Sequence, residues 1–398
     1  MKRKDLIKGS RIHAEIAKSG LLHDMNICLG NSLVNMYAKC GAFVKAHAVF
    51  DELPVQDVVS WNILIGEYAK YGHGKEALIC YEEMRLNGIC PTAVTFVFIL
   101  KACGIIRETC KGQEIHYEVV RLGLLKKNCI VGNALVGMYA KCGELAKAQT
   151  LHDELSTQSL ITWNALISGY AHRGRSHDAL NCFEQMRSEG LSPDGVTFTC
   201  ILKACANVGD VSKGKLIHDE VIRKGLLYRN VVLGTALVDM YAKCGLLVKA
   251  HEVLKELHIR DAVAWSALIA GYAQHEQGHE ALQCFEQMQR EGFSPDVVTF
   301  TSILKACGST GDVDKGKEIH DEITRRGFLK KNILLGNALL DMYARCGSLH
   351  IAQEVLQRIQ SREVITWNAL LSGFIIVFMI STEEMVMKII TPVIESET

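Results

Sequence analysis

Residues 160 to 194 read LITWNALISGYAHRGRSHDALNCFEQMRSEGLSPD, and recognisable copies of this stretch stand 102 residues away on both sides. The four tryptophans of the chain mark the copies, at Trp61, Trp163, Trp265 and Trp367. A fixed period of this kind is typical of an array of repeated structural units rather than of a single globular core. This stretch and its copies therefore predict a fold built of repeated structural units.

Two further strings follow the same period and divide each block into three units. M-Y-A-K/R-C-G begins at Met36, Met138, Met240 and Met342, and I-L-K-A-C begins at Ile99, Ile201 and Ile303. Aligning the strings gives units of 35, 36 and 31 residues. We expect ten complete units over 27–363, starting at residues 27, 58, 93, 129, 160, 195, 231, 262, 297 and 333. A partial unit precedes them at 1–26, and a degenerate unit with a divergent tail follows at 364–398.

Each unit is predicted to form two helices. Trp61, Leu64, Ile65 and Tyr68 are spaced as i, i+3, i+4 and i+7, which places them on one helical face. A second helix follows, and glycine and proline residues end it. One such pair cannot bury its apolar face alone, so it must stack on its neighbours. We expect an all-α solenoid of helix-turn-helix repeats whose first helices line a groove.

Composition and termini restrict the function only loosely. Lysine plus arginine equal aspartate plus glutamate at 44 each, so the net charge gives no general attraction to polyanions. The 15 cysteines include no C-x-x-C pair, and ten of them recur with the period, which favours packing over disulfides. No signal peptide is visible. The apolar run Ala369 to Ile380 is shorter than the roughly 20 residues that span a bilayer, so no membrane association is expected.

A polar stripe lies beside the apolar face of the first helices. In one 31-residue unit Asn31, Asn35 and Lys39 are four residues apart and share a face. The other 31-residue units carry Asn133, Gly137 and Lys141; Thr235, Asp239 and Lys243; and Asn337, Asp341 and Arg345. The 36-residue units keep the cation as Lys101, Lys203 and Lys305 and open with Val97, Thr199 and Thr301.

The polar stripe can be interpreted as a ligand-binding surface or as an ordinary solvated helix face. An amide can donate and accept at a base edge, a hydroxyl can do either, and a cation can meet a phosphate. On a single helix, a solvated polar face would be the better interpretation. Recurrence in register along the whole array favours a binding groove instead.

The strings VSWNILIGEYAKYGHGKEALICYEEMRLNGICP, VTFTSILKACGSTGDVDKGKEIHDEI and LGNALLDMYARCGSLHIAQEVL resemble the P, L and S repeats of plant pentatricopeptide repeat (PPR) proteins of the PLS subclass. The resemblance covers residues 8 to 373 and labels the ten units in S-P-L order, with an L-type partial unit at 1–26. Tetratricopeptide (TPR) arrays are similar in their paired helices but lack these unit lengths and strings. The resemblance implies a right-handed superhelix that holds single-stranded RNA in its groove, one base per repeat.

In that family the fifth and last residues of a repeat together choose the base, and an apolar second residue flanks it. Carried over, the pairs are Asn31 with Asp57, Asn62 with Thr92, Asn133 with Ser159, Asn164 with Asp194, Thr235 with Asp261, Ser266 with Asp296, and Asn337 with Glu363. The apolar second residues of the P-like units are Val59, Ile161 and Val263. The phosphate contacts would be Lys39, Lys101, Lys141, Lys203, Lys243, Lys305 and Arg345.

The family's code then suggests particular bases. Asparagine with aspartate suggests uracil, asparagine with serine suggests cytosine, and threonine or serine with aspartate suggests guanine. The first units would therefore read pyrimidines, and the units of Thr235 and Ser266 would read guanines. The pair Val97 with Asn128 fits no code, and Asn337 with Glu363 leaves its base open.

No catalytic function or cofactor is expected. Many PLS proteins end in a cytidine deaminase domain, whose zinc needs H-x-E together with P-C-x-x-C. H-x-E occurs at His13, His116, His152, His218 and His320, but no P-C-x-x-C completes it, and four of these histidines share one repeat position. Phosphate-binding loops and nucleophile elbows are also absent from the sequence.

Two classes of function remain. The first is an organellar RNA-binding protein that directs RNA processing, most naturally cytidine-to-uridine editing with a deaminase or editing cofactor supplied in trans. The resemblance places it in a mitochondrion or chloroplast, although no transit peptide is visible. The alternative is a TPR-like scaffold whose groove binds protein. A scaffold has no need of code-like pairs at the fifth and last positions.

Overall fold

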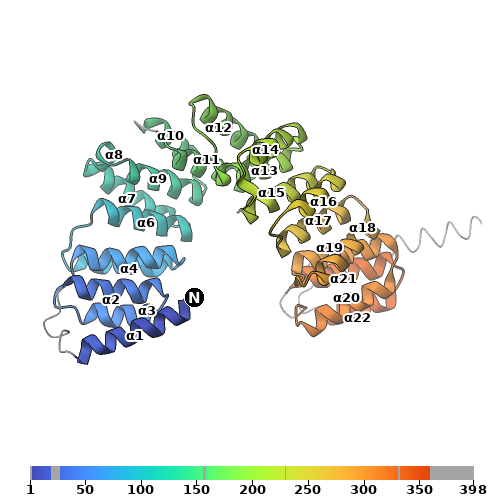
Figure 1. Cartoon of the computed structure of the whole chain (residues 1–398), viewed down its shortest axis with the longest axis horizontal. Helices are drawn as coiled ribbons and strands as arrows, with labels where there is room; N and C mark the ends of the chain where they lie inside the picture. The colour runs from blue at the N-terminus through green and yellow to red at the C-terminus, as the bar shows by residue number, and fades with distance from the viewer. Residues whose placement is uncertain (1, 19–26, 156–157, 229, 330–331, 359–398) are drawn as a thin grey trace, which may run out of the picture. The chain divides into compact units, whose positions relative to one another are not determined.

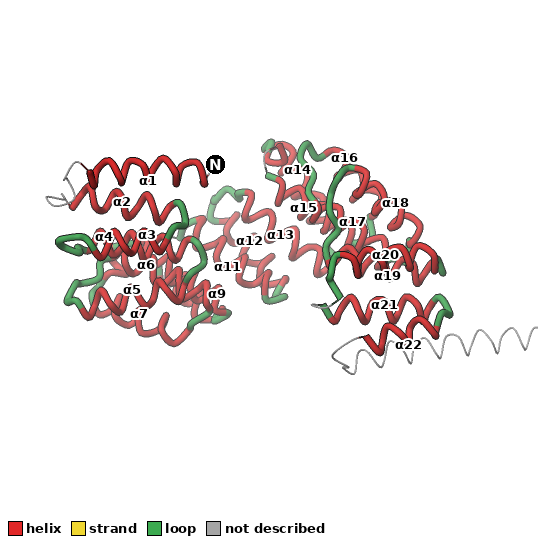
Figure 2. Tube along the Cα trace, turned by 90° about the horizontal axis from the view of Figure 1, so that it is seen from below, coloured by secondary structure: helices red, strands yellow, loops and turns green. Residues whose placement is uncertain are grey.

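The computed structural model describes residues 2–18, 27–155, 158–228, 230–329 and 332–358. Within these ranges the regular structure is entirely helical, which confirms the predicted fold class (Figures 1 and 2). The chain divides into two compact units, residues 1–201 and 202–398, and the division falls inside one helix, α13 (Gly195–Val208). The tail at 364–398, with Trp367 and the apolar run from Ala369, lies outside the described residues.

The first unit contains twelve complete described helices. They are α1 (Lys2–Lys18), α2 (Ile27–Lys39), α3 (Phe43–Asp51), α4 (Val58–Lys70), α5 (Gly74–Leu86), α6 (Ala93–Ile106), α7 (Thr109–Arg121), the short α8 (Leu124–Lys127), α9 (Cys129–Cys142), α10 (Leu145–Glu154), α11 (Leu160–His172) and α12 (Ser176–Ser188).

The second unit repeats the pattern. Its described helices after α13 are α14 (Val211–Arg223), a 3-10 turn at Leu226–Tyr228, α15 (Val231–Lys243), α16 (Leu247–Glu256), α17 (Ala262–Gln274), α18 (Gly278–Arg290), α19 (Val297–Thr310), α20 (Val313–Arg325), α21 (Ile333–Arg345) and α22 (Leu349–Arg358).

The helices alternate between two layers within each unit. The first helix of every pair packs on the first helix of the next: α2, α4, α6, α9 and α11 follow one another in the first unit, and α15, α17, α19 and α21 in the second. In every pair other than α13 and α14, the second helix packs on the first (Figure 2). These first helices and α13 begin at the ten residues where the sequence period starts a unit. Their assignment to L, S and P types stays a proposal.

The repeated apolar residues form the core. Trp61, Leu64, Ile65 and Tyr68 are all buried, as are their counterparts around Trp163 and Trp265. The 15 cysteines are free thiols. Burial raises the pKa of Cys103 and Cys284 to about 12, so these periodic thiols stay protonated and serve as small packing groups.

Helix ends follow from single residues. After α12 the chain turns at Gly190, whose φ of +80° belongs to the left-handed region that glycine adopts at low cost. The turn lets the Leu191 N–H donate to the Met186 carbonyl at 3.3 Å, which satisfies a group that the helix end leaves open. In the described parts of the chain, no helix combines the length and apolar character needed to cross a bilayer.

Candidate nucleic-acid interface

In most of the described repeats, the last residue caps the first helix of the next repeat. Asp57 precedes α4, and its Oδ1 accepts hydrogen bonds from the N–H groups of Val59 at 3.1 Å and Ser60 at 2.8 Å. Asp261 accepts from Ala264 in the same way at 2.8 Å, before α17. Aspartate, serine and threonine are preferred at such caps because a short side chain reaches the open N–H groups. Capping alone therefore accounts for the residue types found at the last position.

The fifth residue of the repeat reaches the same cap from the neighbouring first helix. Asn31 Nδ2 lies 3.4 Å from Asp57 Oδ1, Asn62 Nδ2 3.5 Å from Thr92 Oγ1, and Asn133 Oδ1 3.4 Å from Ser159 Oγ. Thr235 Oγ1 lies 3.2 Å from Asp261 Oδ1. The structure therefore brings together residues that are separated by 26 to 30 positions in the sequence. A ligand that touches one side chain of such a pair meets the other.

The pair Asn164 and Asp194 has the most contacts. Asn164 Nδ2 donates to Oδ1 at 3.2 Å and to Oδ2 at 3.3 Å, and Asp194 Oδ1 also accepts from the N–H of Val196 and of Thr197. The Thr197 hydroxyl lies between the partners, 2.6 Å from Asn164 Oδ1 and 3.0 Å from Asp194 Oδ1. Burial raises the pKa of Asp194, but these hydrogen bonds outweigh it, so the pKa is lowered from the ordinary value. The carboxylate is charged at neutral pH, and its Oδ2 keeps unused acceptor capacity.

Threonine at the third position of the helix is a contributor that the sequence interpretation missed. Thr299 links Ser266 to Asp296: its hydroxyl lies 2.6 Å from Ser266 Oγ and 2.7 Å from Asp296 Oδ1. Its oxygen also accepts from the Asp296 N–H, which completes a reciprocal cap. The signal was present in the sequence as D-x-x-T before an apolar run.

The expectation that Ser266 faces the groove is wrong in this structure. The residue is only 4% exposed, and its hydroxyl bonds to the Ala262 carbonyl at 2.8 Å besides contacting Thr299. A short hydroxyl inside a helix commonly bonds back to the preceding turn, and this draws Ser266 away from the surface. Exposed Asp296 is the group that a ligand can meet at this repeat.

Two other predicted fifth residues are largely covered. Asn31 is 9% exposed and Asn337 is 8% exposed. The Oδ1 atoms of Asn31 and Asn62 are buried and have no partner in the structure. Glu363, the predicted partner of Asn337, lies outside the described residues.

The 36-residue units lack the pair. Val97 has no polar group, and the hydroxyls of Thr199 and Thr301 bond to the carbonyls of Gly195 and Val297 at 2.7 and 2.8 Å. Asn128 and Asn230 cap α9 and α15 instead. The stripe is therefore chemically uneven, and one unit in three offers no paired polar group of this kind.

An exposed aliphatic residue occupies the second position of nearly every first helix. The members are Val59, Val94, Ile130, Ile161, Val196, Val232, Val263, Val298 and Leu334, each 51 to 64% exposed. Each of these residues precedes the fifth residue of its repeat by about one helical turn. The sequence analysis identified only Val59, Ile161 and Val263 of this set. An exposed apolar side chain therefore recurs at one position along the first-helix layer.

The predicted cations fall into two groups. Lys243 Nζ pairs with Asp239 at 2.8 Å, and Arg345 Nε pairs with Asp341 at 2.9 Å, on the same helix in each case. For the other five, Lys39, Lys101, Lys141, Lys203 and Lys305, the described residues supply no ion pair. Burial of its stem lowers the pKa of Lys141, and the neighbouring charge of Lys101 lowers it further. Two adjacent like charges without a counter-ion attract an anion.

A pocket of about 500 Å³ shows how these groups combine in the second unit. It lies among α17, α19 and α21, and its lining includes Ala270, Thr301, Lys305, Leu334 and Asp341. A cation, an exposed aliphatic side chain and a carboxylate therefore border one hollow on the first-helix layer. This combination suits a ligand with both an apolar ring and an anionic group.

The histidines of the H-x-E strings join neighbouring repeats. His116 Nδ1 lies 2.8 Å from the Tyr139 hydroxyl, and His13, His218 and His320 make the same contact with Tyr37, Tyr241 and Tyr343 at 3.0 Å. His152 is fully buried against Trp163, with ring centroids 4.3 Å apart. Among the described residues, no three histidine, cysteine or acidic side chains are grouped so that they could hold a metal ion. The geometry supports a structural role for these histidines.

Together these features define a helical-repeat protein whose first-helix layer carries paired polar groups, exposed aliphatic residues and cations. The model of the PPR repeat family matches residues 56–104, 158–207 and 260–309. The model of the single PPR repeat matches residues 31–58, 133–159, 196–226, 235–261, 298–328 and 337–364. The chain belongs to the pentatricopeptide repeat family.

Similar proteins agree with this assignment. A chloroplastic pentatricopeptide repeat-containing protein of Arabidopsis thaliana is 35% identical over 370 residues, which is 93% of this chain and 45% of that protein. A mitochondrial one from the same plant is 33% identical over 371 residues, 93% of this chain and 53% of that protein. The chain thus spans about half the length of the curated relatives it matches.

Solved structures show the same fold. PPR10 in complex with an 18-nt psaJ RNA element has a TM-score of 0.74 and 22% identity, covering 92% of this chain and 55% of that one. PPR10 from maize has a TM-score of 0.63 and 20% identity, covering 98% of this chain and 62% of that one. These matches confirm the predicted solenoid class of paired-helix repeats.

Proposed function

We propose that this chain binds single-stranded RNA along its first-helix layer, one nucleotide per repeat, as a PLS-type repeat protein. The observation that carries the proposal is the recurrent association of two features. A polar fifth residue contacts the cap of the next repeat, and an exposed aliphatic residue lies one turn before it. An amide–carboxylate pair offers donors and acceptors to a base edge, and an aliphatic side chain offers a surface to its ring.

Helix capping by itself accounts for the type of residue at the last position of a repeat. The proposal therefore depends on two features that a helix cap does not need. A helix cap needs no amide at the fifth position of the preceding repeat, and it needs no solvent-exposed valine or isoleucine two residues into the helix. Both are present at Asn164, Asp194 and Ile161. A groove that binds protein has no requirement for either feature at a spacing of one repeat.

The pairs suggest a partial target sequence. In chain order, the units that start at residues 27, 129, 160 and 231 would read uracil, cytosine, uracil and guanine, from Asn31 with Asp57, Asn133 with Ser159, Asn164 with Asp194, and Thr235 with Asp261. The unit at 262 keeps an exposed Asp296, but its buried Ser266 leaves the base less defined, and guanine is proposed there from Asp296 alone. The 36-residue units and the pair Asn62 with Thr92 leave their positions unspecified.

The cellular role is proposed from the relatives. They are named as chloroplastic or mitochondrial proteins, and PPR10 was solved with an RNA element, which supports an organellar RNA as the partner. In this role the chain selects a site for processing, foremost cytidine-to-uridine editing, and does no chemistry itself. A deaminase or editing cofactor acting in trans would supply the reaction.

Binding to a small set of oligonucleotides tests the proposal. RNAs that carry U-N-N-C-U-N-G-G in either polarity would be compared with the same RNAs in which the specified bases are exchanged, U for G and C for A. We expect one polarity to bind at least tenfold more tightly than its exchanged partner at equal salt, because each wrong base leaves paired polar groups unsatisfied. Equal binding of all the RNAs would reject base reading, and binding of none would favour the protein-scaffold alternative.

A further inference from the structure

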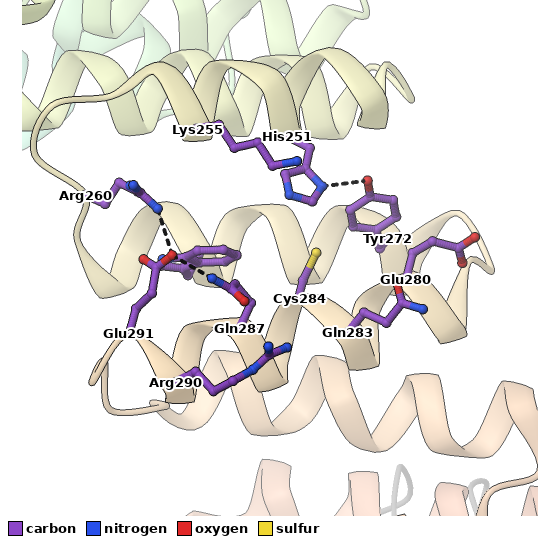
Figure 3. A pocket seen from close by; sticks show the side chains of 11 residues that line it. His251, Lys255, Arg260, Tyr272, Glu280, Gln283, Cys284, Gln287, Arg290 and Glu291 are labelled. Carbon is purple, nitrogen blue, oxygen red and sulfur yellow. Dashed lines mark hydrogen bonds and ion pairs between the residues drawn. The ribbon is translucent and has the colours of Figure 1, made fainter.

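A second hollow lies on the other layer of the second unit, away from the proposed RNA-binding positions. It has a volume of about 460 Å³ and is bordered by α16, α17 and α18. Figure 3 shows His251 and Lys255 on one side, from α16, and Gln287 and Arg290 on the other, from α18. None of its lining residues takes part in the polar pairs described above.

The lining contains a buried donor with no partner. Trp265 is 2% exposed, and its Nε1–H has no hydrogen-bond acceptor among the described residues. A buried N–H that makes no hydrogen bond is unfavourable, and an acceptor supplied by a ligand would satisfy it. The lining also contains the donors Lys255 and Arg290 and the amide of Gln283, together with the carboxylates of Glu280 and Glu291.

The first unit shows which acceptor suits this N–H. There the corresponding Trp163 Nε1 donates to Glu189 Oε2 at 3.0 Å. The counterpart of Glu189 in the second unit is Glu291, but Arg260 holds this carboxylate at 2.8 Å and Gln287 donates to the same oxygen at 3.0 Å (Figure 3). Oε1 of Glu291 is thus held by two donors, and this carboxylate makes no hydrogen bond with Trp265 Nε1.

The charges around the second site differ from those in its copies. Lys255, Arg260 and Arg290 correspond to Asp153, Gln158 and Ser188 one block earlier, and to Asp51, Gln56 and Leu86 two blocks earlier. Trp61, in the earliest copy, also has an unpaired Nε1–H, but no cation stands at the corresponding positions there. Among Trp61, Trp163 and Trp265, the copies within the described residues, only Trp265 combines an open donor with added positive charge.

Two of these cations are available for a ligand. Within the described residues, neither Lys255 nor Arg290 forms an ion pair, whereas Arg260 is occupied by Glu291. Glu280 is exposed at the far end of the hollow, beside Tyr272. Cys284, which also lines the pocket, is held as a neutral thiol because burial raises its pKa to about 12. The hollow therefore carries two cations without an ion pair among the described residues, alongside the Arg260–Glu291 pair and the exposed Glu280.

We propose that this pocket binds a carboxylate ligand, which accepts a hydrogen bond from Trp265 Nε1 and is neutralised by Lys255 and Arg290. The carboxylate comes from a glutamate or aspartate side chain of a protein partner or from a free organic diacid. The proposal is independent of RNA binding, because the site lies on α16 to α18 and uses none of the fifth, last or second residues of the repeats.

The test follows the indole N–H resonances of the full chain by NMR during titration, with Trp265→Phe used to assign the signal of Trp265. The probes are an acetylated and amidated peptide of alternating glutamate and glycine, the matched glutamine peptide, glutarate, inorganic phosphate and a short oligouridylate. We expect the glutamate peptide to shift the Trp265 signal while the Trp163 signal stays in place. If glutarate produces the shift as strongly, the ligand is a small diacid. An equal response to phosphate, oligouridylate or the glutamine peptide would overturn the carboxylate assignment.

A variant built from the chain's own earlier copy provides the matched control. Lys255→Asp, Arg260→Gln and Arg290→Ser together give this site the residues of the first-unit site, so folding is expected to persist. Glutamate-peptide binding should fall at least tenfold, whereas Lys75→Asp, which reverses an exposed charge on α5, should leave it unchanged. Unchanged binding to the triple variant, or no response of Trp265 to either carboxylate probe, would refute the proposal.

Discussion

Asn164 Nδ2 donates to both carboxylate oxygens of Asp194, at 3.2 and 3.3 Å, across a separation of 30 residues. The contact joins the first helix of one repeat to the residue that caps the first helix of the next. The distance between the two side chains therefore depends on how the two repeats stack. Substitutions at Asn164 or Asp194 therefore distinguish a role of the pair in stability from a role in ligand recognition.

Replacing Asn164 with threonine should change base preference without unfolding the array. The hydroxyl retains a donor toward Asp194, as Thr235 does toward Asp261 at 3.2 Å, but the amide that would face the base is lost. We expect preference at one nucleotide to move from uracil toward guanine by about tenfold, or about 1.4 kcal/mol. Binding to four oligonucleotides that differ at that position measures the shift. The melting temperature serves as the control, and an unchanged base profile would remove the coding role of this pair.

The carboxylate of Asp194 predicts a dependence of stability on pH. Its pKa is lowered in the folded chain, because hydrogen bonds from Thr197, Asn164 and Val196 outweigh the effect of burial. A lowered pKa means that the stabilisation is complete above the ordinary aspartate value of about 3.9 and is lost as pH falls below it. Urea unfolding of Asp194→Asn should therefore show a weaker loss of stability between about pH 5 and pH 3 than the unchanged chain. Asparagine also caps helices well, so the two chains should be nearly equally stable at pH 7. Parallel pH profiles would show that the interaction does not favour the charged form.

The two groups of cations predict different effects on RNA affinity. Lys141 lacks an ion pair in the described structure, whereas Lys243 is paired with Asp239. Lys141→Ala should weaken binding of all RNA sequences by a similar factor and reduce the slope of log affinity against log salt by about 0.7. The matched change Lys243→Ala should reduce both quantities less, because Asp239 already offsets that charge. Titrations at three salt concentrations measure both slopes, and a sequence-selective loss for Lys141→Ala would contradict a phosphate contact.

The sequence predicted the array and much of the candidate site, for reasons visible at particular residues. The period that places Trp61, Trp163 and Trp265 in register also marked the residues at which first helices begin, because repeated packing requires repeated apolar faces. The same repeat alignment paired Asn164 with Asp194, and these two side chains are hydrogen-bonded in the structure. Ser266 was misjudged because a helical hydroxyl can bond to the preceding turn, a local choice that repeat alignment does not reveal.

Other sequence features were compatible with two different structural roles. The spacing of Asp239 and Lys243 is that of an ion pair within one helix, and the structure makes that pair. Aspartate at the end of a repeat indicates a helix cap as much as a base reader, and Asp57 acts as a cap. The open N–H of Trp265 and the Arg260–Glu291 pair depend on side-chain placement in three dimensions, which the sequence alone does not determine.

His152 predicts an acid-sensitive weak point in the first unit. The ring is fully buried against Trp163, and neither nitrogen has a hydrogen-bond partner. Burial lowers the pKa of His152, so as pH falls below the ordinary histidine value of about 6.5 the unfolded chain takes up the proton first, and stability declines. The corresponding residues of neighbouring blocks are Phe50 and Leu254, both buried. His152→Leu should raise the free energy of unfolding at pH 7 by about 1–3 kcal/mol, because the unsatisfied polar atoms are removed.

The reciprocal change provides the control for His152. Leu254→His should destabilise the second unit and introduce a loss of stability between about pH 7 and pH 5, because it buries an imidazole at the same repeat position. Urea unfolding of both variants at several pH values measures the two effects, with tryptophan fluorescence of Trp163 and Trp265 reporting on the respective units. If His152→Leu proves less stable than the unchanged chain at pH 7, the edge-on contact of the imidazole with Trp163 contributes more than its unpaired nitrogens cost, and His152 is a packing residue that leucine cannot replace.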